Sequence, residues 1–177
     1  EYELGKIKVS FDVSLLNAGD SLFVSLPSGF KFADGVTPDN PYSLSVSGTT
    51  YYVGSSNYKF ALDFPTVNNA FKGLDTTAIS VYRVADNQIQ IKFNFGGSSS
   101  PFVDPNEDTG YFYLHLKNIY VDSGYSGDVK VTFEGAPGTV FSGTASVVVA
   151  TVGGGNVDVA VEDTATLTSV AEGVYIK

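Results

Sequence analysis

A run of β-branched residues that ends in three consecutive glycines, ASVVVATVGGG at residues 145–155, most constrains the fold of this chain. Its valines and threonine suit a β-strand that is apolar on both faces. The glycines end such a strand because they pack no side chain and are conformationally loose. We therefore predict a β-sheet body over residues 1–152, followed by a glycine hinge and a strand-forming tail over residues 153–177.

The residues before this run predict a series of short strands. The clearest strand pattern is KIKVSFDVSL at residues 6–15, in which every second residue is apolar. Similar patterns recur about every 10 residues, between turns rich in Gly, Pro and Asn. Only one helical turn is expected, around residues 69–74. With 177 residues, 43% of them hydrophobic, the chain is long enough to bury a core. We predict an all-β fold, an antiparallel β-sandwich (Ig-like or jelly-roll-like) with a strand-forming terminal extension.

Composition excludes several classes of function. The chain contains no cysteine, which rules out disulfides, thiolate metal sites and cysteine nucleophiles. Its formal charge of -9 leaves no basic stripe for nucleic acid, so no nucleic-acid partner is expected. No apolar stretch approaches the roughly 20 residues of a membrane span. The chain also lacks methionine, including an initiator, which favours a processed chain.

An acidic loop is the one candidate metal site. Residues 104–108, DPNED, bring three carboxylates and an amide together in sequence, and calcium prefers such hard oxygen ligands. The candidate ligands are Asp104, Asn106, Glu107 and Asp108. The alternative is a solvated acidic loop, since the spacing matches no EF-hand pattern. No other cofactor is expected.

Catalytic residues cannot be assigned from the sequence. His115 is the one histidine, and the strand pattern points it outward beside Tyr113. No serine motif such as GxSxG accompanies it, so we expect an ordinary surface histidine and a protein that is not an enzyme. The 11 tyrosines offer a different activity, because exposed aromatic rings stack on sugars or fill protein interfaces. The alternative is that they pack on sheet faces.

The two ends of the chain predict self-assembly. An amphipathic strand starts close to the N-terminus, and strand-like segments lie beyond the glycine hinge. A terminal segment that completes the sheet of a neighbouring copy makes a head-to-tail contact, which propagates as a filament. The alternative is that both ends pair within the same sandwich. The candidate interface residues are Ile7, Val9, Phe11, Val13 and Leu15 in the first strand, and Val157, Val159, Val161, Val174 and Ile176 in the tail.

Three segments carry a family resemblance: LPSGFKF at residues 26–32, LHLKNIYVDSGYSGDVKVTFEG at residues 114–135 and ASVVVATV at residues 145–152. They resemble modules of surface and S-layer-associated proteins of anaerobic Gram-positive bacteria. The tail is similar to the segment that follows those modules. The resemblance implies a secreted β-sandwich, extracellular or at the cell surface, in mature form with its signal peptide removed. Such modules often lie beside copper-amine-oxidase-like domains. The resemblance nevertheless brings no catalytic or copper ligands to this sequence, because one histidine and no cysteine could not build an ordinary copper site.

These observations lead to one expected function and one alternative. We expect a structural subunit of an extracellular filament or surface layer, pilus-like, whose partners are copies of itself joined by β-strand complementation. The alternative is an adhesin or carbohydrate-binding module that recognises surface glycans through outward tyrosines or the loop at residues 96–110.

Overall fold

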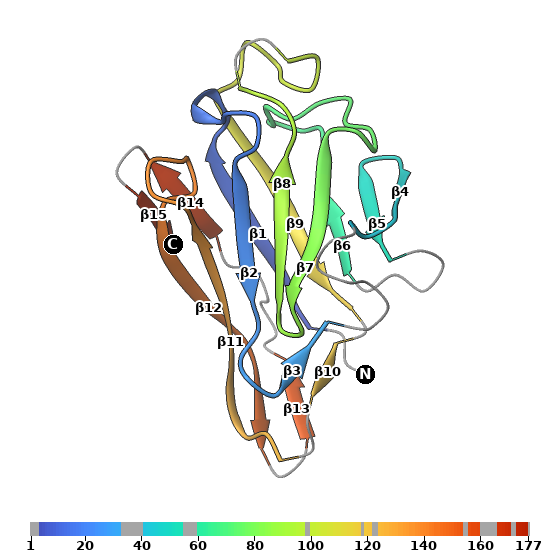
Figure 1. Cartoon of the computed structure of the whole chain (residues 1–177), viewed down its shortest axis with the longest axis vertical. Helices are drawn as coiled ribbons and strands as arrows, with labels where there is room; N and C mark the ends of the chain where they lie inside the picture. The colour runs from blue at the N-terminus through green and yellow to red at the C-terminus, as the bar shows by residue number, and fades with distance from the viewer. Residues whose placement is uncertain are drawn as a thin grey trace.

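The chain folds as an all-β sandwich of two large sheets, as the sequence predicts. The computed structural model (Figure 1) describes residues 4–32, 41–54, 60–97, 100–117, 119–121, 124–153, 156–159, 166–170 and 173–176, the last three ranges by their backbone alone. Among these residues there is no α-helix, only the short 3-10 turn η1 (Val13–Leu15).

One sheet has seven strands. In spatial order they are β15 (Gly173–Ile176), β14 (Thr166–Val170), β1 (Lys6–Asp12), β9 (Thr109–Leu116), β6 (Phe60–Asp63), β5 (Thr50–Val53) and β4 (Leu44–Ser47). All neighbouring pairs are antiparallel except β14 and β1, which run parallel. The first and last described strands of the chain therefore lie near each other at one side of this sheet.

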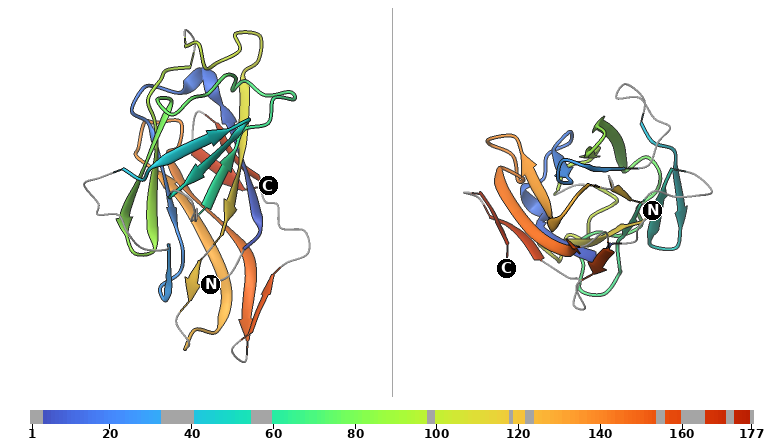
Figure 2. Two further views of the ribbon diagram at one scale, coloured as in Figure 1. Left: turned by 90° about the vertical axis from the view of Figure 1, so that its right-hand side faces the viewer. Right: turned by 90° about the horizontal axis from the view of Figure 1, so that it is seen from below.

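The second sheet has six strands and packs against the first (Figure 2). In spatial order they are β13 (Asn156–Val159), β12 (Gly143–Gly153), β11 (Gly127–Gly135), β2 (Ser21–Ser25), β8 (Gln88–Phe93) and β7 (Ile79–Ala85). A further two-stranded ribbon joins β3 (Phe30–Lys31) to β10 (Tyr120–Val121). Every described strand pair in the six-stranded sheet and in this ribbon is antiparallel.

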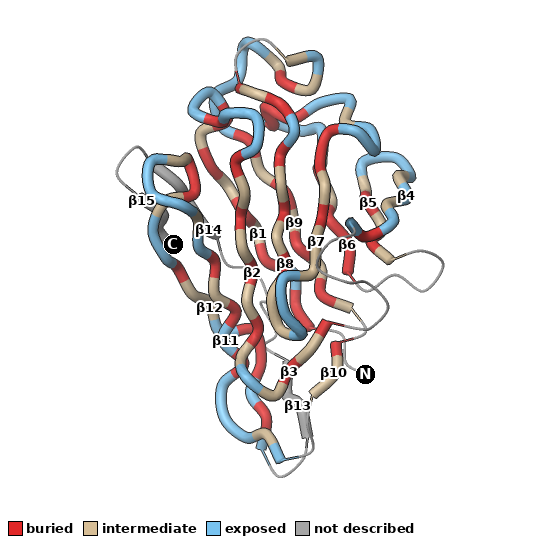
Figure 3. Tube along the Cα trace, viewed as in Figure 1, coloured by how far each residue is buried: buried red, intermediate tan, exposed pale blue. Residues whose placement is uncertain are grey.

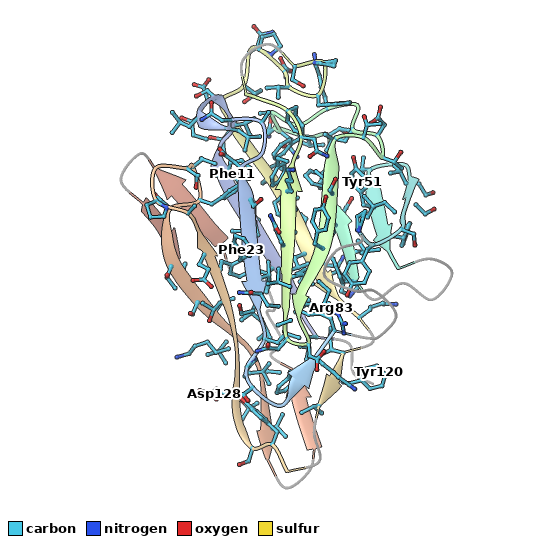
Figure 4. The ribbon with its side chains drawn as sticks, viewed as in Figure 1. Phe11, Phe23, Tyr51, Arg83, Tyr120 and Asp128 are labelled. Atoms are coloured by element: carbon cyan, nitrogen blue, oxygen red, sulfur yellow. The ribbon has the colours of Figure 1, made fainter. Side chains whose placement is uncertain are left out.

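The core between the sheets follows from strand alternation. Along β1 every second side chain is buried, and the same period holds in β2, β8 and β9, so each strand turns one face inward (Figure 3). Aromatic rings fill the centre. Phe11 on β1 (Figure 4) meets Phe141 edge-to-face at 4.8 Å and Phe93 on β8 at 5.8 Å between ring centroids. These ring contacts connect the two sheets.

Two local predictions are wrong. The first strand ends at Asp12 instead of residue 15, because the Asp12 carboxylate accepts a hydrogen bond from Ser14 N (2.9 Å) and caps η1. The helical turn expected at residues 69–74 is absent. Instead Phe71 forms an isolated β-bridge with Val103, which ties this loop to the loop at residues 100–108.

Candidate functional site

β1 is the strand at which the two ends of the chain meet. It pairs with β9 on one side, from Lys6 opposite His115 to Asp12 opposite Thr109. On its other side it pairs with β14. Ile7, Val9 and Phe11 are buried in the core of their own chain. Their predicted role between copies stays a prediction, since the structure contains one chain.

The last two candidate residues of the N-terminal segment lie in η1. Val13 is buried and its N–H donates to Asp108 O at 2.7 Å. Leu15 is 41% exposed. The turn therefore places them on different sides of the chain, where an uninterrupted strand would have kept them on one face.

The tail first extends the six-stranded sheet. Gly153 lies opposite Asn156, with only Gly154 and Gly155 between them, and two-residue Gly-Gly connections are typical of tight β-hairpins. Of the predicted interface residues, Val157 lies opposite Val152 and Val159 opposite Ala150. Val161 lies outside the described residues.

The rest of the tail extends the other sheet. β14 pairs with β1 from Lys8 opposite Thr166 to Phe11 opposite Ser169. β15 then pairs with β14, which sets Val174 opposite Ser169 and Ile176 opposite Leu167. Sequence reasoning missed β14, although the β-branched residues of TLTSV are a strand signal. The tail thus pairs with its own body in this structure, and its hairpin β14–β15 covers the edge of β1.

The candidate calcium ligands are held by backbone contacts. Asp104 accepts a hydrogen bond at Oδ1 from Asn106 N (2.9 Å), and Asp104 N donates to Ala70 O (2.7 Å). Asn106, Glu107 and Asp108 are exposed. Within the described part of the chain, no three His, Asp or Glu side chains gather as a metal-binding group. Calcium binding stays a prediction without geometric support.

A polar aromatic surface formed by Lys8, Tyr111 and Tyr113 lies on the outer face of β1 and β9. Tyr111 and Tyr113 meet at 85° with centroids 6.0 Å apart, and Lys8 Nζ lies 4.7 Å from the Tyr111 centroid. The Tyr111 hydroxyl donates to Val67 O at 2.5 Å. Burial raises the pKa of Tyr111, and Tyr113 and Asp63 add to the shift. Perpendicular rings, one of them covered by an ammonium group, do not make a flat platform for a sugar ring.

Comparison with known proteins gives no identity. No family model, no curated protein and no solved structure matches this chain. In the part of the chain that the structure describes, no helix has the length and apolar character needed to cross a membrane.

Proposed function

We propose that this chain is a structural, non-enzymatic subunit of an extracellular filament or surface layer, and that its copies join by exchange of the hairpin β14–β15. The observation that supports this proposal is the parallel pairing of β14 with the edge of β1. The hairpin is attached to the seven-stranded sheet through this one ladder. A hairpin from a second copy would make the same ladder.

The physical argument concerns the edge of β1. Without β14, the backbone N–H and C=O groups on that side of β1 have no strand partner, and an open edge attracts another strand. Strand addition satisfies those groups with backbone hydrogen bonds. Because an exchanged element makes the contacts that it makes within one chain, exchange between copies costs little free energy.

The connection before β14 limits how copies could be arranged. Six residues, 160–165, separate Val159 from Thr166, and an extended chain of that length reaches about 24 Å. A donor's β13 must therefore end within that distance of the acceptor's β1, so neighbouring copies would touch. The resemblance to surface-layer modules supports an extracellular location.

A glycan-binding module is the second candidate. Its candidate contact residues are the outward Tyr111 and Tyr113, but their perpendicular rings do not form a flat stacking platform, so this candidate ranks below assembly. A glycan that binds only the folded chain raises its melting temperature as the glycan concentration rises, and does so without assembly. A subunit instead polymerises at high concentration with no ligand added.

Disulfide trapping tests the exchange. The chain has no cysteine, so introduced thiols pair only with each other. Ser10 lies opposite Thr168, and neighbouring strands about 4.8 Å apart suit a disulfide. Separate Ser10→Cys and Thr168→Cys chains are mixed, allowed to assemble and oxidised. We expect a covalent dimer of one chain of each kind.

The matched control mixes a Thr168→Cys chain with a Lys6→Cys chain. Lys6 lies on the same face of β1 as Ser10 but four residues before it, and Ser10 is the residue opposite Thr168. This mixture should give little dimer. A chain that carries both Ser10→Cys and Thr168→Cys should give a ladder of covalent multimers. If the double-cysteine chain forms only an intrachain disulfide and the Ser10→Cys and Thr168→Cys mixture gives no dimer, the hairpin stays with its own chain and the proposal is wrong.

Electron microscopy of the same samples, with calcium and with chelator, reports whether fibres or sheets form.

A further inference from the structure

More than half of β12 lacks a described strand partner on one side. β11 pairs with β12 along nearly its whole length, from Gly127 opposite Val152 to Gly135 opposite Gly143. On the other side β13 pairs with Ala150 to Gly153 only. Among the described residues, no strand is hydrogen-bonded to the outer side of β12 at residues 143–149.

This open stretch lacks the charged residues and proline that protect most edge strands. Natural sheet edges are guarded by charged side chains, proline, short length or bulges. Residues 143–149, GTASVVV, contain no charge and no proline, and Val148 is 44% exposed. A bulge lies at one end of the stretch, since Val129 is opposite Ala150 and Lys130 is opposite Val148, which leaves Val149 as the extra residue on β12. Residues 143–148, before this bulge, pair in regular register with β11. The stretch is therefore suited to bind another uncharged strand.

The C-terminal hairpin lies at this open stretch. Cα atoms of β15 come within 8 Å of β12, although the two strands belong to different sheets. In Figures 1 and 2 β13 lies with the far end of β12 at the narrow end of the molecule, whereas β14 and β15 lie along the flank. β1 and the open stretch of β12 thus form the two walls of a seam between the sheets, with the hairpin against both.

We infer that residues 143–149 of β12 are a second docking edge for the hairpin, and that a hairpin donated by a second copy is held by β14 on β1 and by β15 on β12. The occupant follows from the sequence of the hairpin, because GVYI in β15 is uncharged and rich in strand-forming residues. This inference rests on the proposed exchange for the source of the hairpin. Its consequence is that a donated hairpin joins both sheets of the acceptor, so a pull on the filament loads two ladders instead of one.

Hydrogen exchange of the full-length chain tests this inference. The assembled chain is compared with a Thr168→Pro variant, in which the hairpin cannot complete its ladders. Thr168 has β1 on one side and β15 on the other, so proline removes a ladder hydrogen bond whichever way that N–H points. Thr168→Val, which keeps the N–H, is the matched control. We expect exchange to be at least about 10-fold slower at residues 143–149 and at Lys8 to Phe11 in the parent than in the proline variant.

The outcomes separate the two proposals. Slower exchange at β1 with no change at residues 143–149 overturns the second docking edge and leaves hairpin exchange standing. Slower exchange at both edges that persists after dilution to monomers keeps the docking edge but assigns the hairpin to its own chain, against the filament proposal. No difference from the proline variant at either edge overturns both.

A surface variant gives an independent test. Val148→Lys places a charge on the open stretch, which should slow assembly at least about 10-fold. Val84→Lys on β7 is the matched control, because Val84 is also an exposed valine on a strand (40%, against 44% for Val148). Equal assembly rates for the two folded variants would contradict docking at β12.

Discussion

The side chain of Asn69 pairs with the backbone of Tyr111 by two hydrogen bonds. Asn69 Oδ1 accepts from Tyr111 N at 3.0 Å, and Asn69 Nδ2 donates to Tyr111 O at 2.8 Å. The position is significant because β6 pairs with β9 only as far as Asp63 opposite Tyr113. The carboxamide of Asn69 thus substitutes for a strand backbone where β6 has ended, and supports the part of β9 that faces β1.

We predict that Asn69→Ala destabilises the chain by about 2–4 kcal/mol. Asn69 is buried, and its amide also bonds Pro65 O (2.6 Å) and Phe71 N (3.1 Å). Its removal leaves backbone groups buried without partners. Urea unfolding measures the loss. Asn94→Ala is the control, since Asn94 bonds Thr77 O and Ser80 Oγ at the surface and should cost less than about 1 kcal/mol. Equal losses would show that Asn69 does not replace a strand.

The turn that follows β1 depends on a close backbone approach at Gly97. A Cβ at this position would lie 1.8 Å from Val13 O, and Gly97 N donates to Leu16 O at 2.8 Å. We predict that Gly97→Ala costs at least about 2 kcal/mol, because the backbone of η1 must shift to relieve the overlap. Thermal unfolding checks this. Gly124→Ala, where no atom lies within 4 Å of the added Cβ, should change stability by less than about 1 kcal/mol.

Alkaline pH should unfold the chain partly through Tyr51. Tyr51 is fully buried and its hydroxyl donates to Asp75 O. Burial, with the Asp75 carboxylate nearby, raises the pKa of Tyr51 above its usual 10.0. A raised pKa means that the neutral phenol stabilises the folded state below pH 10, and that this contribution falls as the pH rises through and above 10.

Tyr51→Phe tests that dependence. At neutral pH we expect a loss of about 1 kcal/mol for the missing hydrogen bond. Above pH 10 the variant should lose stability less steeply than the parent, since it has one phenol fewer to ionise on unfolding. Urea unfolding at pH 8 to 11 gives the slopes. Tyr52→Phe, on the outer face of the same strand, controls for the loss of a hydroxyl. Parallel slopes for Tyr51→Phe and the parent would disprove the assignment.

The sequence predicts the sandwich well and the connections poorly. Alternation in β1 and β9 marks their inward faces directly, because a strand shows its burial with a period of two. Asn69 gives no comparable signal, since its role depends on where β6 ends and on the distance to Tyr111, both of which are tertiary facts. The parallel register of β14 on β1 is equally invisible, because short polar strands specify their partners weakly. The sequence of the tail predicts strands, but not the strands with which they pair.

A chain that ends at Val159 should fold, fail to assemble and cap filaments of the full-length chain. It keeps β13, which pairs with the end of β12, and the described core extends from Leu4 to Val152, so the body retains its buried side chains. Such a chain can accept a hairpin at β1 but cannot donate one. Added to the full-length chain at a rising ratio, it should shorten filaments progressively, as measured by electron microscopy. The control adds an equal amount of further full-length chain, which should not shorten them. If filaments kept their length while the truncated chain remained folded and monomeric, the residues beyond Val159 would not be the donor, and assembly would have to use another edge of the sandwich.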